Sequence, residues 1–119
     1  MASVTPTVTR ISADGNKSWV VSWLTMANGD TGLPIELPAH SDRSVQLGGT
    51  FSTGGTVVLE GSNDGTNYIT LDDFQGNALS FTSADLESVS QITRYIRPDI
   101  TAGDGSTSID VYLLLTGAL

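Results

Sequence analysis

The chain has 119 residues, a length typical of one domain that buries a single hydrophobic core without metal or disulfide staples. Thirteen acidic residues against five basic ones give a net charge of −8, which argues against binding to the phosphate backbone of nucleic acid. The absence of cysteine excludes a disulfide scaffold, thiol catalysis and cysteine-ligated zinc.

Residues 1–10 are rich in Thr and Val and contain Pro6, and we expect them to form an extended arm ahead of a single domain at residues 11–119. The arm lacks the basic start and apolar run of a secretory signal, so we expect a protein made in the cytoplasm. No stretch of the chain approaches the roughly 18 consecutive apolar residues of a membrane span, so no membrane partner is expected.

Residues 17–24 alternate with a period of two, which predicts a strand. Both faces of this strand carry apolar side chains, so we expect the core to cover one face and another surface to cover the second. Trp19 and Trp23 share one face and have two interpretations, as core residues or as anchors of a subunit interface. A sugar-stacking platform is a third alternative.

Pro34 and Pro38 bracket a short extended piece around Ile35. Proline cannot donate a hydrogen bond to a strand ladder, so a loop or a sheet edge is expected here. Residues 44–51 then alternate between apolar and polar side chains and are predicted to form a strand of the core.

Residues 56–71 predict a β-hairpin. Apolar residues alternate on both sides of Asp64 and Gly65, and these two residue types accept the positive φ that a tight hairpin turn requires. The pattern therefore predicts antiparallel β structure.

An EF-hand calcium site is excluded in this hairpin, because Leu71 stands where a bidentate glutamate is needed. A looser oxygen site from Asp64, Asp72 and Asp73 is an alternative to the plainer interpretation of turn residues on a solvated acidic edge. We predict no metal site.

Residues 83–91 carry the one helical spacing of apolar residues, and we expect at most one short helical turn there. A strand is predicted over residues 94–100. Alternation puts Arg94 on the inward side with Ile96, where its guanidinium would need a carboxylate or carbonyl groups. Arg97 falls on the outward face. A structural clamp is the plainer interpretation of the two arginines, and anion recognition is the alternative.

A last strand is predicted over residues 107–115, with alternate apolar residues on one face. In total, about eight short strands at a spacing of roughly 8–12 residues, separated by Gly, Asp and Asn turns, favour an antiparallel β-sandwich or barrel.

No catalytic constellation is predicted. His40, Ser41 and Asp42 are consecutive, so in extended chain their side chains point to opposite sides and cannot align as base, nucleophile and orienting acid. Asp72 and Asp73 are adjacent, whereas the two carboxyls of a glycosidase face each other across a cleft.

The run VVLEGSNDGTNY at residues 57–68, followed by RYIRP at residues 94–98, resembles two groups of proteins. It is similar to the SNDG hairpin and RYIR strand of discoidin-type jelly-roll domains. It also resembles small structural proteins of tailed bacteriophages, in particular head decoration or cement proteins. The resemblance covers residues 56–115 and implies an all-β, jelly-roll-like sandwich. It implies structural roles in turn, packing and strand pairing for six residues: Asp64, Gly65, Tyr68, Arg94, Ile96 and Arg97.

The phage resemblance implies a non-enzymatic virion protein without a cofactor, which binds the outer surface of a major capsid shell as a homodimer or homotrimer. The discoidin resemblance implies a carbohydrate-binding module as an alternative, and a tail or baseplate component is a further alternative. We expect the contacts to come from apolar residues of the arm and the proline-bracketed loop, together with the tryptophans and the C-terminal residue: Val4, Pro6, Val8, Trp19, Trp23, Leu33, Ile35, Leu37 and Leu119.

Overall fold

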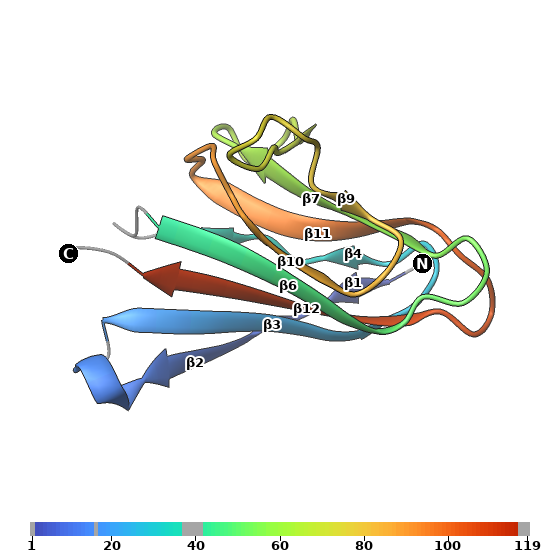
Figure 1. The fold of residues 1–119 in the computed structure, drawn as a ribbon, viewed down its shortest axis with the longest axis horizontal. Helices are drawn as coiled ribbons and strands as arrows, with labels where there is room; N and C mark the ends of the chain where they lie inside the picture. The colour runs from blue at the N-terminus through green and yellow to red at the C-terminus, as the bar shows by residue number, and fades with distance from the viewer. Residues whose placement is uncertain (1, 16, 37–41, 117–119) are drawn as a thin grey trace.

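The computed structural model describes residues 2–15, 17–36 and 42–116, and these residues form a two-layer β-sandwich (Figure 1). One layer, the β3/β12 sheet, has the strand order β10 (Asp85–Ser88), β6 (Asp42–Thr50), β12 (Ser108–Thr116), β3 (Ser18–Met26) and β2 (Thr7–Ile11). The other layer, the β7/β11 sheet, has the order β1 (Ser3–Val4), β4 (Thr31–Gly32), β11 (Tyr95–Ala102), β7 (Thr56–Ser62) and β8 (Ile69–Thr70), and β5 (Ile35–Glu36) and β9 (Ser80–Phe81) pair with β11 and β7.

The chain alternates between the two sheets along its sequence, as in a jelly roll. Strands β3, β6, β10 and β12 lie in one sheet, and the strands that follow each of the first three lie in the other. Strand pairing is therefore mostly between strands distant in the sequence, as for β11 with β7 and β12 with β6. This is the double Greek-key connection of jelly rolls. The predicted all-β jelly-roll sandwich is confirmed.

The described residues contain twelve strands, more than the eight that we predicted. The difference has a structural cause. β4 and β5 are two pieces of one jelly-roll strand, as are β8 and β9, and β1 and β2 precede the jelly roll.

The core lies between the sheets, and alternation along the strands fills it. In β12, four residues at a period of two are fully buried, as predicted: Ile109, Val111, Leu113 and Leu115. Ile96 and Ile100 of β11 are buried opposite them, which confirms the predicted inward positions of these two residues.

Trp23 is a core residue with an exposure of 0%. Its indole Nε1 donates a hydrogen bond of 2.9 Å to the carbonyl of Leu33. Gly32 lies against this ring, since a Cβ added there would come within 2.7 Å of the indole and 2.6 Å of Pro98 Cδ. The predicted interface role of Trp23 is therefore wrong, and the core interpretation holds.

The extended N-terminal segment lies against the body of its own chain (Figure 1). β1 runs parallel to β4, with Ser3 opposite Thr31, and the N–H of Ala2 donates to Asp30 Oδ1 at 3.0 Å. β2 pairs antiparallel with β3 and forms one edge of the β3/β12 sheet.

Residues 83–91 form no helical turn, which is within the prediction of at most one. β10 pairs antiparallel with β6, and Leu86 lies opposite Gln46. Leu86 is 62% exposed and Val89 is 3% exposed, so the spacing of three does not mark a shared buried face. Pairing with β6 outweighs the local helical pattern. A short 3₁₀ helix is found instead at Ser12–Asp14.

Candidate functional site

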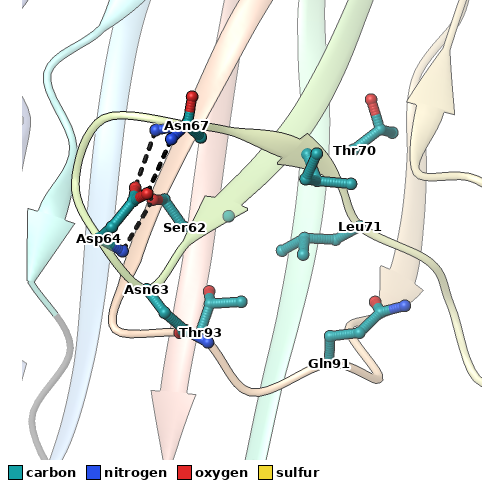
Figure 2. Close-up of a pocket in the computed structure, with 10 residues that line it drawn as sticks. Ser62, Asn63, Asp64, Asn67, Thr70, Leu71, Gln91 and Thr93 are labelled. Atoms are coloured by element: carbon teal, nitrogen blue, oxygen red, sulfur yellow. Dashed lines mark hydrogen bonds between the residues drawn. The ribbon is translucent and has the colours of Figure 1, made fainter.

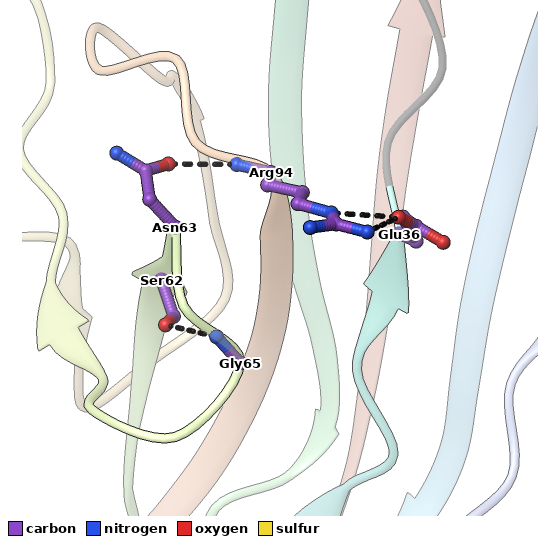
Figure 3. Close-up of polar contacts among 5 residues, drawn as sticks. All are labelled: Glu36, Ser62, Asn63, Gly65 and Arg94. Atoms are coloured by element: carbon purple, nitrogen blue, oxygen red, sulfur yellow. Dashed lines mark hydrogen bonds and ion pairs between the residues drawn. The ribbon is translucent and has the colours of Figure 1, made fainter.

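The loop between β7 and β8 is built around the carboxylate of Asp64 (Figure 2). Oδ1 accepts hydrogen bonds of 2.8 Å from the backbone N–H groups of Thr66 and Asn67, and Oδ2 accepts one of 2.8 Å from Asn67 Nδ2. Ser62 Oγ donates to the same carboxylate at 2.8 Å and accepts from the N–H of Gly65 at 2.9 Å (Figure 3). These bonds, first among them the one from the Asn67 backbone, hold the pKa of Asp64 well below its usual range.

This connection is wider than the predicted tight turn. β7 ends at Ser62 and β8 begins at Ile69, so a loop joins them. Gly65 has a φ of 76°, as the prediction required, but Asp64 is not among the described residues with positive φ. Ile69 is 71% exposed whereas Leu71 is 3% exposed, so these two do not share a buried face as the hairpin pattern suggested.

A pocket of about 400 Å³ lies beside the loop (Figure 2). Several polar groups on its wall already bind within the chain. Asn63 Oδ1 accepts from the N–H of Arg94 at 2.9 Å (Figure 3). Gln91 Oε1 accepts from the N–H of Asp72 at 2.6 Å, and Gln91 Nε2 donates to Asp72 Oδ2 at 3.0 Å. These groups position the loop against the 90–94 segment, which favours a structural role for the pocket wall.

Arg97 joins β11 to β7 on the outer face of the β7/β11 sheet. Its Nε donates to Glu60 Oε1 at 3.0 Å, across the strand pair. Its guanidinium carbon lies 3.7 Å from the centroid of the Tyr68 ring. The side chains of Arg97 and Glu60 are 28% and 15% exposed, so the pair is largely shielded from solvent. Burial raises the pKa of Tyr68. Arg97 thus faces outward, as its place in the alternation predicted.

Arg94 points into solvent, so its predicted inward position is wrong. β11 begins at Tyr95, and the strand alternation does not extend back to Arg94. Its Nη2 lies 2.7 Å from Glu36 Oε2, and the two side chains are 59% and 55% exposed (Figure 3). This hydrogen bond raises the pKa of Arg94. The carboxylate that the sequence required is present, but at the surface.

The other predicted contact residues lie in separate parts of the fold. Val8 on β2 is 45% exposed, and Leu33 between β4 and β5, in the other sheet, is 41% exposed. The ring of Trp19 is covered by Arg10, whose guanidinium carbon lies 4.8 Å from the ring centroid. Four of these residues are half-buried: Val4, Pro6, Trp19 and Ile35. Two lie outside the described residues: Leu37 and Leu119.

Three large apolar side chains that we did not predict as contacts are exposed, one on β8 and two on the connections from β8 to β9 and from β10 to β11. Ile69, Phe74 and Ile92 are 71%, 74% and 66% exposed. The two connections are joined, since the N–H of Ser90 donates to the carbonyl of Asp72 at 3.0 Å. We call these three residues the apolar edge. The available sequence signal was an apolar Phe74 inside an otherwise polar turn.

The outward side of the β3/β12 sheet has an uncharged centre, which we call the neutral face. Strand register places ten residues there: Thr7, Thr9, Val20, Ser22, Ser44, Gln46, Leu86, Ser88, Tyr112 and Leu114. A hollow of about 310 Å³ lies in the middle of this face, lined by Val20, Leu86, Tyr112 and Leu114 together with two polar side chains of β6.

Among the described residues, no group of three or more His, Asp or Glu side chains is placed to hold a metal ion. The carboxylates of Asp64, Asp72 and Asp73 each accept hydrogen bonds in a different turn or contact. His40 and Ser41 lie outside the described residues. In the described part of the chain, no helix has the length and apolar character to cross a membrane.

Comparison with known proteins gives a fold likeness. Neither a family model nor a curated protein matches the chain. The crystal structure of the SPBc2 prophage-derived protein YomS is similar, with a TM-score of 0.61 over 82% of this chain and 93% of that chain. The sequence identity is 9%, so the likeness shows a shared fold.

Proposed function

We propose that this protein is a non-enzymatic structural component of a bacteriophage virion, which binds the outer surface of the major capsid shell as a decoration or cement protein. The fold likeness to a prophage-derived protein supports a phage-related role. The net charge of −8 supports a place outside the shell, because packaged DNA repels an acidic surface.

The observation that carries the proposal is the apolar edge, and Phe74 in particular. The turn that presents Phe74 is fixed by Asp73, whose Oδ1 accepts from the N–H groups of Gln75 and Asn77 at 2.8 and 3.0 Å. Asp73 itself is 7% exposed, whereas Phe74 is 74% exposed. An aromatic side chain on a pre-ordered turn loses little conformational entropy when a partner covers it. Contiguous exposed apolar patches are typical of protein contact sites, and the proposal takes the apolar edge to be such a site.

The alternative of a carbohydrate-binding module has less support from the geometry. Sugar binding needs an accessible aromatic face with unused polar groups beside it. Trp23 is buried, and Arg97 covers one face of Tyr68. In the loop pocket, the amide of Gln91 and the Oδ1 of Asn63 already bind within the chain.

The test uses phage particles produced by the source cell and stripped of the protein by mild chaotrope. The purified protein is added back, and binding is measured by co-sedimentation and particle survival on heating. We expect Phe74→Ala to weaken binding by about 2 kcal/mol, or roughly thirtyfold, as for a central interface anchor. Leu24→Ala is the matched control. Leu24 is also a large exposed apolar residue, at 44%, but it lies on β3, away from the apolar edge.

Two further results decide between the alternatives. Binding to heads but not to isolated tails is expected, and binding to tails alone would support the tail or baseplate alternative. Free monosaccharides are expected not to compete, and competition that depends on Phe74 would support the carbohydrate-binding alternative. Equal binding by Phe74→Ala and the unmodified protein would contradict the assigned contact.

A further inference from the structure

We propose that the neutral face binds the neutral face of a second copy of this chain, so that the protein is a homodimer with two β3/β12 sheets packed against each other. This inference concerns the free protein, and it stands or falls independently of binding to a shell.

In the middle of this sheet, strand register aligns outward side chains from all five strands in two rows that run across the strands. The first row contains Leu86, Gln46, Tyr112, Ser22 and Thr7. The second row contains Ser88, Ser44, Leu114, Val20 and Thr9. Six of these side chains line the hollow of about 310 Å³: the larger Val20, Leu86, Tyr112 and Leu114, together with Ser44 and Gln46. The surface therefore offers both projections and a recess to a partner.

The distribution of charge favours a second copy as the partner. Two copies that each carry a net charge of −8 repel each other through most of their surfaces. On the outward side of the described β3/β12 strands, the carboxylates of Asp42 and Asp110 lie beyond the two rows along the strand direction, one on each side, opposite Thr116 and Gly48. The centre between them carries no charge. Contact through this face therefore brings two acidic chains together with the least repulsion.

The outward side of this sheet is large enough for a stable dimer. Five strands spaced about 4.8 Å apart, with central strands of nine residues, give the whole outward side, including the ends that carry Asp42 and Asp110, an area of roughly 600 Å² per copy. Two copies that met over this whole side, with the neutral face at its centre, would bury about 1,200 Å², the lower end of the range of stable protein interfaces. Sheets pack face to face about 10 Å apart, and the other side of this same sheet already packs in that way against the β7/β11 sheet.

The experiment measures the mass of the full chain by sedimentation equilibrium over a wide range of concentrations. The unmodified protein is expected to approach twice the mass of one chain as its concentration rises. Gln46→Glu changes one atom in an exposed side chain of the first row, and across the two-fold axis it places two carboxylates in the interface. We expect self-association to weaken by at least about tenfold, because like charges that face each other are repelled.

Gln75→Glu is the matched control, since it makes the same chemical change in an exposed turn of the β7/β11 sheet side. It is expected to leave self-association unchanged, and circular dichroism checks that both variants fold. A chain that stays monomeric at every concentration overturns the proposal. So does a dimer that Gln46→Glu leaves intact. If Val8→Lys disrupts such a dimer, the contact lies at the β2 edge instead of the neutral face.

Discussion

The two outer faces of the sandwich differ in how their side chains find partners. On the β7/β11 sheet, Arg97 binds Glu60 and stacks on Tyr68, so this pair of charges on the outer face has its partners within the chain. On the β3/β12 sheet, the centre of the outer face holds Leu86, Tyr112 and other uncharged side chains that leave a hollow between them.

This difference separates stability from association. A face whose charges are already paired gains little from a partner, because a partner would have to displace or desolvate those pairs. A face of uncharged side chains loses little solvation when it is covered, and it gains from burial. Substitutions on the first face should therefore change the free energy of unfolding, and substitutions on the second should change binding between copies.

The largest effect is expected for Arg97→Ala. The substitution leaves the carboxylate of Glu60, which is 15% exposed, without its partner and removes the guanidinium from the Tyr68 ring. We expect the free energy of unfolding to fall by about 2 kcal/mol, measured by urea denaturation. Arg97→Lys is the control, and it should recover part of the loss because it keeps the charge without the planar stacking group. A loss below about 0.5 kcal/mol for Arg97→Ala would remove the contrast between the two faces.

The second effect is the pH dependence that Asp64 confers on the same side of the sandwich. Hydrogen bonds from Asn67, Thr66 and Ser62 lower the pKa of this carboxyl in the folded state. Since an unfolded Asp has a pKa of about 3.9, the stabilisation is complete above that pH and is lost as the pH falls toward the folded value. Asp64→Asn should therefore be less stable than the unmodified protein near neutral pH, and the difference should shrink on acidification.

Urea denaturation of both proteins near neutral pH and at roughly pH 2 measures this difference, with the lower pH chosen below the unfolded pKa. A difference that is equal at the two pH values would mean that the carboxylate charge of Asp64 does not stabilise the loop.

Much of the fold followed from the period of two, because long strands with one buried face leave a clear pattern. Ile109 and Leu115 show this in β12, and Ile96 shows it in β11. The same rule failed where a strand ended. Arg94 lies one residue before β11, so the alternation of the strand does not determine its side-chain direction. It forms an ion pair with Glu36 at the surface. The helical spacing of residues 83–91 had little weight for a different reason, because their partner β6 is distant in the sequence and decides their conformation.

The candidate contact surfaces were harder to predict. A sequence shows that Phe74 or Leu86 is apolar, but it does not show which apolar residues the second sheet leaves uncovered. For Trp23 the difficulty was the reverse. Tryptophan is typical of interfaces, but this side chain is buried in the core, beside Gly32 and Pro98. Burial depends on the packing of the two layers, and local patterns carry little information about it.

A smaller effect is expected for Leu86→Ser on the neutral face. Leu86 is 62% exposed on an edge strand, so its removal opens no cavity in the core. At concentrations where the chain is monomeric, we expect the free energy of unfolding to change by less than about 0.5 kcal/mol. At higher concentrations the unmodified protein should gain apparent stability that the variant lacks, because association favours the folded state. Thermal denaturation at several protein concentrations measures both effects. A concentration-independent loss above about 1 kcal/mol would show that Leu86 stabilises the single chain instead.

The smallest effect is expected for Arg94→Ala, and it tests the comparison most closely. Arg94 and Arg97 lie near each other in the sequence, and each binds one glutamate of a neighbouring strand. They differ in solvent access, since the Arg94 and Glu36 side chains are 59% and 55% exposed. Water and salt screen such a pair, and holding two long side chains together opposes the attraction. We therefore expect no measurable change in Tm at physiological ionic strength. If Arg94→Ala destabilised the protein as much as Arg97→Ala, shielding from solvent would not be what distinguishes the two pairs.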